Sequence, residues 1–254
     1  MPQTIAFLGA TGGCGLSTLA RSLAAGHTCQ ALCRTPARLT TGLETNYPST
    51  PGANLTITQG DALDEAAVTK ILMHPSDPAR LVDTIVFSIG SAFDAKRLAV
   101  ENLTICADAM TVLLSTLDKL VAEGGGAGRT YPRIVAISST GISDKGRDYP
   151  LLVAPLYGWL LKGPHEDKKK MEALLRGGKG REWTLVRPML LKDGKNETKP
   201  IRAGVEDVEA GVVESREWGY CITRDDVGRW ISENLIEGGG IEGKYLRKAV
   251  ALTT

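Results

Sequence analysis

The fold is decided by the stretch Thr4-Ile5-Ala6-Phe7-Leu8-Gly9-Ala10-Thr11-Gly12-Gly13-Cys14-Gly15. An apolar strand runs directly into a glycine-rich turn, and a helix-compatible segment follows from Gly13 to Ala25. Strand, glycine turn and helix in this order are what a dinucleotide-binding βαβ unit requires. The pyrophosphate of a dinucleotide lies against unpaired N–H groups at a helix N-terminus, and a Cβ in the turn would hold it away.

The glycines follow the spacing Gly9-x-x-Gly12-x-x-Gly15, which differs from the G-x-G-x-x-G fingerprint of many dehydrogenases. A tight turn without a ligand is the alternative interpretation, and the strand before the turn and the helix after it argue against that. The phosphate loop of nucleoside triphosphatases is excluded, because no Gly-Lys-Ser/Thr follows the glycines. The turn therefore predicts a nicotinamide dinucleotide site.

The end of the second expected strand, Thr28–Cys33, indicates which dinucleotide is bound. An NAD site usually carries an Asp or Glu about 20 residues past the glycines, where it holds the ribose 2′-hydroxyl. Here that place holds Arg34, with Arg38 four residues on and no carboxylate. Arginine can bind a phosphate with two parallel hydrogen bonds, so we expect NADP(H) as the cofactor. A pair of surface arginines on a loop is the alternative.

The rest of the chain alternates strands with helices. A break at His74-Pro75-Ser76-Asp77-Pro78 ends one helix, and the apolar stretch Ile142–Gly163 is either a packed helix or a lid over a substrate. The pattern predicts an α/β fold, a Rossmann-type doubly wound parallel sheet in a single domain 1–254, with a small C-terminal substrate-facing part. The further expected elements are the strands Asn54–Thr58, Asp83–Phe87, Arg133–Ile137, Trp183–Arg187, Ile201–Val205, Trp218–Ile222 and Tyr245–Val250, and the helices Glu65–Met73, Asn102–Val121, His165–Gly177 and Asp226–Ile236.

The amino-acid composition limits the kinds of partner that the chain is expected to bind. The chain has 254 residues, with 30 basic against 29 acidic side chains and a net charge of +1, so nothing favours binding to nucleic acid or to an anionic membrane. The five cysteines are scattered and form no Cys-x-x-Cys pair, and the N-terminus lacks the features of a signal peptide. We expect reduced thiols, no structural metal, a cytoplasmic location, a small-molecule substrate, and a monomer or homodimer.

Several stretches together resemble the atypical short-chain dehydrogenases/reductases, in particular the NmrA-like NAD(P)H-binding proteins and the reductases of the flavin/biliverdin-IXβ type. They occur in the family's order along nearly the whole chain. The matching pieces are Gly9-Ala10-Thr11-Gly12-Gly13-Cys14-Gly15, Leu32-Cys33-Arg34, Gly60-Asp61, Ile137-Ser138-Ser139-Thr140-Gly141, Lys168 with Glu172, Trp183-Thr184-Leu185-Val186-Arg187-Pro188 and Ile222-Thr223-Arg224-Asp225-Asp226-Val227.

The resemblance implies which residues hold the cofactor. The glycine turn would hold the pyrophosphate, Arg34 and Arg38 the 2′-phosphate, and Ser139 the nicotinamide end. The implied cofactor-binding residues are Gly9, Thr11, Gly12, Gly13, Cys14 and Gly15 at the pyrophosphate, Asp61 and Ala62 by the adenine, Ser88, Ile89 and Gly90 by the ribose, Ser138 and Ser139 beside the nicotinamide, Lys168, and Pro188, Met189 and Leu190 at the carboxamide.

Catalysis departs from the pattern of the wider superfamily, whose Tyr-x-x-x-Lys pair donates a proton from a phenol beside an ammonium. Ser139 fits the family's serine and Lys168 its lysine, but Pro164 stands where the tyrosine would be. Tyr157 and His165 are the remaining candidate proton donors, with a solvent-exposed place at the helix start as the simpler interpretation of His165. Reductases of the biliverdin type manage without the tyrosine, and solvent can supply the proton.

We therefore expect an NADPH-dependent oxidoreductase that reduces a small or medium-sized apolar, aromatic or conjugated substrate: a carbonyl compound, quinone, flavin or biosynthetic intermediate. Two alternatives stay open. One is an NmrA-like NADP-binding redox sensor that regulates a partner without catalysis, which the missing tyrosine favours. The other is a non-redox biosynthetic enzyme, an isomerase or cyclase, on the same fold.

Overall fold

The computed structural model describes residues 1–90, 93–94, 99–100, 102–124, 129–153, 161–178, 180–195, 199–237 and 243–254. The strands are β1 (Thr4–Leu8), β2 (Thr28–Cys33), β3 (Leu55–Gln59), β4 (Met73–His74), β5 (Asp77–Leu81), β6 (Thr84–Phe87), β7 (Phe93–Asp94), β8 (Ala99–Val100), β9 (Arg133–Ile137), β10 (Trp183–Pro188), β11 (Leu190–Lys192), β12 (Arg202–Asp207), β13 (Val212–Ser215), β14 (Cys221–Thr223) and β15 (Lys248–Thr253). The helices are α1 (Gly13–Ala24), α2 (Pro36–Asn46), α3 (Glu65–Leu72), α4 (Ile105–Glu123), α6 (Lys162–Arg176) and α7 (Arg224–Ile231), with a 3₁₀ turn η2 (Leu151–Val153) and a π-helical turn η3 (Ser232–Glu237).

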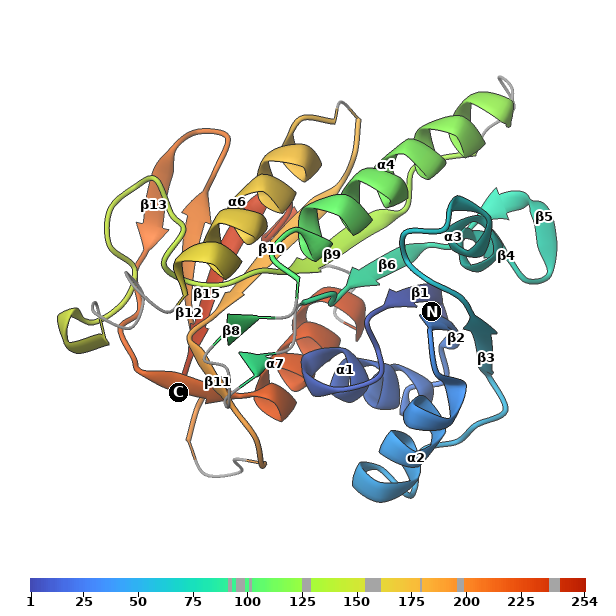
Figure 1. Cartoon of the computed structure of the whole chain (residues 1–254), viewed down its shortest axis with the longest axis horizontal. Helices are drawn as coiled ribbons and strands as arrows, with labels where there is room; N and C mark the ends of the chain where they lie inside the picture. The colour runs from blue at the N-terminus through green and yellow to red at the C-terminus, as the bar shows by residue number, and fades with distance from the viewer. Residues whose placement is uncertain are drawn as a thin grey trace.

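A nine-stranded sheet forms the middle layer of the described part of the chain, in the order β13-β12-β15-β10-β9-β6-β1-β2-β3. All neighbours from β15 to β3 pair in parallel, and β12 and β13 add an antiparallel edge. Helices cover both faces of this sheet (Figure 1). The predicted Rossmann-type fold is confirmed, and the chain reverses its direction of winding between β1 and β6.

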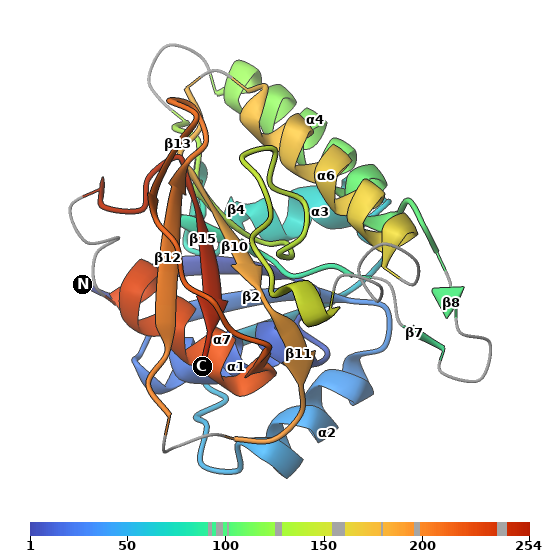
Figure 2. The ribbon, with the colours of Figure 1, turned by 90° about the vertical axis from the view of Figure 1, so that its left-hand side faces the viewer.

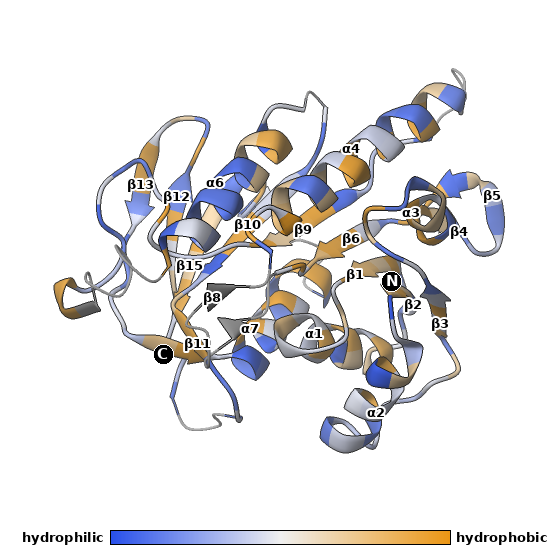
Figure 3. Cartoon of the chain, in the orientation of Figure 1, coloured by the Kyte–Doolittle hydropathy of each residue, from blue (hydrophilic) through white to orange (hydrophobic). Residues whose placement is uncertain are grey.

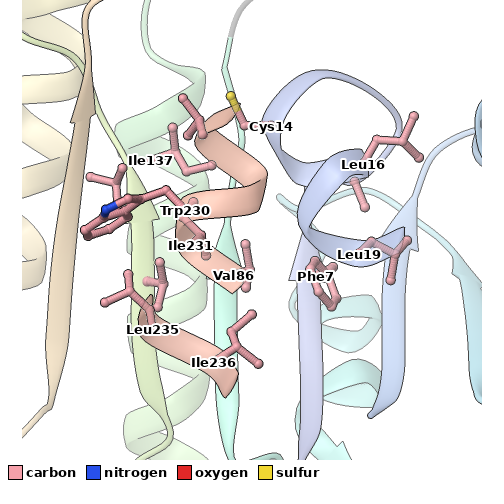
Figure 4. Close-up of a cluster of buried hydrophobic side chains, with 14 of the residues drawn as sticks. Phe7, Cys14, Leu16, Leu19, Val86, Ile137, Trp230, Ile231, Leu235 and Ile236 are labelled. Carbon is pink, nitrogen blue, oxygen red and sulfur yellow. The ribbon is translucent and has the colours of Figure 1, made fainter. Parts of the chain in front are cut away.

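The central parallel strands are buried on both faces, as a parallel sheet requires. Along β1, Ile5 and Phe7 join one apolar cluster while Ala6 and Leu8 join the other. Figure 4 shows the first cluster, in which Phe7 lies near α1 and Trp230 comes from α7. Apolar residues concentrate in the sheet and on the inner faces of the helices, and polar residues lie outside (Figure 3).

Helices α1 and α7 lie side by side on one face, as Figures 1 and 2 both show. Their contact is close because α7 carries Gly228, where a Cβ would stand 2.4 Å from the Cβ of Ser17 on α1. One turn earlier, Arg224 of α7 lies beside Gly13 of α1. The two helices therefore run in the same direction, and their N-termini lie at the same edge of the sheet.

Some local elements differ from the sequence expectations. Residues 36–46, for which no element was expected, form α2, because Pro36 is the first residue of a helix, where its missing N–H costs nothing. Arg38 consequently lies on a helix and not on a loop. The break at His74 is an antiparallel hairpin of β4 and β5, and β13 is an exposed edge strand that its pattern does not reveal. Among the described residues, no helix is both long enough and apolar enough to cross a bilayer.

Candidate functional site

Four neighbouring parallel strands, β1, β6, β9 and β10, bring the predicted site segments to one edge of the sheet. The glycine turn follows β1, and Ser88–Gly90 follows β6. Ser138 and Ser139 follow β9, while Pro188 ends β10 and precedes Met189 and Leu190. Carboxyl ends of parallel strands next to the point where winding reverses form the ligand crevice of open α/β sheets.

The glycine turn is shaped by close contacts that only glycine permits. Gly9 has φ +92°, and a Cβ there would stand 2.6 Å from the backbone carbon of Ser88. A Cβ on Gly15 would stand 2.6 Å from the carbonyl oxygen of Gly9 and 2.8 Å from Ser88 Oγ. The end of β6 and the start of α1 are therefore packed against each other through these two glycines.

Gly12, in contrast, faces open space, with no described atom within 4 Å of where its Cβ would be. It is the N-cap of α1, and among the described residues no side chain caps the first turn, which also lacks an acidic residue. The unpaired N–H groups and the positive end of the helix dipole are thus left available to an anion.

The residues present fit a dinucleotide. Gly12 leaves room for a pyrophosphate, and Ser138 Oγ, on the same edge, is buried without a hydrogen-bond partner among the described residues. A buried hydroxyl without a partner is costly, so a polar ligand group next to it would be stabilised. Cys14, in the first turn of α1, is buried, which raises the pKa of its thiol to about 12 and keeps it neutral.

Helix α6 presents two of the predicted catalytic side chains at this edge. Lys168 Nζ donates to the carbonyl oxygens of Ile89 at 2.9 Å and Ile137 at 2.6 Å, so the ammonium joins the ends of β6 and β9. His165, one turn earlier, lies with Nε2 3.3 Å from Ser139 Oγ. The structure thus brings Ser139, His165 and Lys168 together beside Ile89.

His165 differs from the sequence expectation of a solvent-exposed residue at a helix start. It is half-buried, and α6 begins three residues earlier, at Lys162, with Pro164 in its first turn, where no N–H is needed. Burial lowers the pKa of His165 to about 4, so the imidazole is neutral at neutral pH. Tyr157, the other candidate donor, lies outside the described residues.

The residues expected around the adenosine half of the dinucleotide follow β2 and β3, which lie on the other side of β1 from β6. Arg34 follows β2 and Arg38 is in the first turn of α2, and both are exposed. Asp61 is exposed, and its carboxylate accepts from the N–H of Leu63 at 3.0 Å. Ala62 is half-buried against the core.

Two residues near the site were missed by sequence reasoning. Asp167, buried on α6, accepts from the N–H groups of Cys106 and Ala107 at 2.9 Å each, so it caps α4 and fixes α6 next to Lys168. No local sequence pattern predicts that a residue of a distant helix caps α4. Arg224 lies against Gly13 of the turn. The pattern Thr223-x-x-Asp226, which is typical of a helix N-cap, indicates that α7 starts here, but it does not indicate the contact with Gly13.

Solved structures share this fold over nearly their whole length. A short-chain dehydrogenase/reductase of Veillonella parvula in complex with NADP aligns with a TM-score of 0.65 and 13% identity, covering 100% of this chain and 95% of that one. ChuY, an anaerobilin reductase of Escherichia coli O157:H7, aligns with a TM-score of 0.64 and 18% identity, covering 98% and 96%. These likenesses show that the chain has the Rossmann-type fold of these proteins.

The sequence comparisons lead to the family. The profile of a family described as NAD(P)H-binding matches residues 9–237, and the chain belongs to this family. A protein named Reductase pytE from Aspergillus terreus is 39% identical over 98% of this chain and 97% of its own length. Another, named Oxidase pynE from Aspergillus niger, is 33% identical over 98% of each chain.

Proposed function

We propose that this chain is an NADPH-dependent oxidoreductase that reduces a small or medium-sized apolar, conjugated substrate by hydride transfer. The observation that carries the proposal is the convergence of Ser139, His165 and Lys168 at the sheet edge that also bears the open glycine turn. The names of the two relatives, a reductase and an oxidase, support redox chemistry. The leucines of η2, Leu151 and Leu152, are exposed, and such an apolar surface is compatible with an apolar substrate.

The bound dihydronicotinamide supplies the hydride, and the side chains supply position and hydrogen bonds. In the tautomer that carries its proton on Nε2, His165 donates to Ser139 Oγ and leaves the serine hydroxyl free to donate to a substrate oxygen. Lys168 uses two of its three N–H donors on Ile89 and Ile137, which orients the third. Since His165 is neutral above a pKa of about 4, it does not supply the proton as an imidazolium at neutral pH.

The first test of the activity is the loss of nicotinamide absorbance from NADPH after mixing with quinones, flavins and carbonyl compounds in a stopped-flow instrument. Turnover of at least one of these classes is expected. Ser139→Ala should lower kcat by about 100-fold and change the Kd for NADPH little, because the hydroxyl acts on the substrate. The matched control is Ser115→Ala, an exposed serine whose hydroxyl bonds only within α4. Equal rates for Ser139→Ala and the control would contradict the role of Ser139.

The preference for NADPH over NADH is the finer part of the proposal. Arg34 and Arg38 flank the N-terminus of α2, which lacks a side-chain cap and an acidic first turn, and such surroundings favour a 2′-phosphate. Arg34→Glu should raise the Kd for NADPH by at least about 30-fold and that for NADH far less, since it replaces an attractive charge by a repulsive one. Equal weakening of both cofactors in a fluorescence titration would refute the assignment of Arg34.

A regulatory module that binds NADP without catalysis is the second candidate, favoured by Pro164 in place of a tyrosine. The same experiments separate the two functions. Tight NADPH binding without turnover on any substrate class, together with a protein partner that binds only one redox form of the cofactor, would support the module. An NADPH-independent conversion of a substrate would support the isomerase or cyclase alternative.

A further inference from the structure

Arg224 is the cation that lies over the glycine turn. It is the first residue of α7, and its Cδ and Nε stand 3.2 and 3.7 Å from the point that a Cβ on Gly13 would occupy. This placement follows from the register of the two helices, which the contact of Gly228 with Ser17 holds one turn further along. The guanidinium is therefore carried next to the N-terminus of α1 by packing and not by a flexible loop.

The charge of Arg224 is only weakly compensated. Its Nη1 donates to Asp193 Oδ1 at 2.8 Å, but the side chains are 37% and 93% exposed, and such a surface pair contributes little stability. The two carboxylates of the first turn of α7 face other partners. Asp225 accepts from Tyr47, Ser17 and Arg21, while Asp226 binds Thr223 and Arg229.

The positive charge of Arg224 also acts on Cys14 in the first turn of α1. Burial raises the pKa of the Cys14 thiol, and the positive charges of Arg224 and Lys168 partly oppose that rise. An anion held by the N–H groups of this turn would lie beside a guanidinium, which binds a phosphate group through two parallel hydrogen bonds.

We propose that Arg224 binds the pyrophosphate of the dinucleotide beside the start of α1, exchanging Asp193 for a phosphate oxygen. This proposal depends on one part of the proposed function, namely that a dinucleotide binds at the glycine turn. It adds a binding residue that serves NADPH and NADH alike, because both carry the pyrophosphate. Arg34, in contrast, concerns the 2′-phosphate.

Calorimetric titration with ADP-ribose tests the proposal, since this probe carries the pyrophosphate but neither the nicotinamide nor the 2′-phosphate. Arg224→Gln should raise the Kd for ADP-ribose, NADH and NADPH by a similar factor, at least about tenfold. Arg202→Gln, which removes the same charge from an exposed ion pair on β12, is the control and should leave all three unchanged. Asp193→Asn should leave the affinity equal or raise it up to about fivefold.

Equal affinities for Arg224→Gln and Arg202→Gln would overturn the proposal, and so would a loss of affinity that affects NADPH alone. A loss of affinity in Asp193→Asn would overturn the exchange of partners. If the unaltered chain binds none of the three probes, the dinucleotide site itself fails, an outcome distinct from the failure of Arg224. Thermal unfolding of each variant, measured alongside, separates a binding effect from a loss of folded protein.

Discussion

Helices α1 and α7 lie side by side with their N-termini at the same edge, yet these termini are built differently. In α7, Thr223 accepts a hydrogen bond from the N–H of Asp226, and Asp225 and Asp226 complement the helix dipole. In α1, the N-cap is Gly12, no side chain in the part of the chain that the structure describes caps the first turn, and no acidic residue is present there. One terminus is satisfied within the protein, whereas the other is left open.

The difference teaches how a structural helix start can be told from a binding site. Capping side chains and carboxylates satisfy the orphan N–H groups of a helix, and they leave nothing for a ligand to gain. The open start of α1 forgoes this stabilisation, which amounts to about a few tenths of a kcal/mol when glycine stands in place of a capping side chain. We interpret the open terminus as the pyrophosphate site and the capped terminus as part of the scaffold that supports it.

The largest effect is expected when the start of α1 is made to resemble that of α7. Gly12 has an extended backbone at φ −179°, and a Cβ there meets nothing within 4 Å, so Gly12→Asp should fold and cap α1. Its carboxylate would repel the pyrophosphate and raise the Kd for NADPH by about 100-fold or more. The free energy of unfolding should change by only a few tenths of a kcal/mol. Cofactor fluorescence and denaturant unfolding measure the two quantities.

Gly12→Asn is the matched control for this prediction, because it offers a cap of the same shape without the charge. Its loss of affinity should be clearly smaller than that of Gly12→Asp. Identical losses in the two variants would mean that bulk and not charge is responsible, and the electrostatic account of the α1 terminus would then be wrong.

A smaller effect, on stability, is expected at the contact between the two helices. In Gly228→Ala the new methyl group would stand 2.4 Å from Ser17 Oγ and 2.8 Å from the backbone nitrogen of Thr18, so the helices must move apart. Overpacking of this kind costs about 1 to 3 kcal/mol, which thermal unfolding would register as a lower Tm. Gly52→Ala, at a position open to solvent, is the control. An unchanged Tm in Gly228→Ala would show that the close contact does not hold the register.

The smallest effect concerns acid stability. Burial raises the pKa of Asp225, but the hydrogen bond from Tyr47, the charge of Arg21 and the bond from Ser17 outweigh it, so the pKa lies below its usual range. A depressed carboxyl pKa adds stability above the unfolded value of about 4, and this stability is lost as the pH falls through the folded pKa. Tyr47→Phe should therefore cost about 0.5 to 1.5 kcal/mol at pH 7. The cost should shrink below about pH 4, as denaturant unfolding at several pH values would measure, and a cost that stays constant with pH would contradict the depressed pKa of Asp225.

Much of the fold was predictable because the buried strands carry strong local signals. The predicted bounds of β1, β2 and β9 agree with the structure, since their apolar runs end in glycine, arginine or serine at the sheet edge. Helix α2 was missed because only Leu39 is buried among its residues, so it shows little apolar periodicity. The edge strand β13 was missed for a similar reason, since it is mostly exposed.

The candidate site was predictable where a residue directly follows a strand or has a recurring spacing. Gly12, Ser139 and Lys168 belong to this group. The places of His165 and Arg224 were not predictable, because they depend on how α6 meets β9 and on the register of α7 against α1. Such contacts are set by tertiary packing, and the local sequence carries no pattern for them.

The most direct test of the account is a crystal structure of the chain with NADP⁺ bound. We expect the pyrophosphate oxygens to accept hydrogen bonds from the N–H groups at the start of α1, next to Gly12, and the first turn of α7 to keep its Thr223 cap. A pyrophosphate bound away from the start of α1, with the Gly12 turn open to solvent, would contradict the central claim.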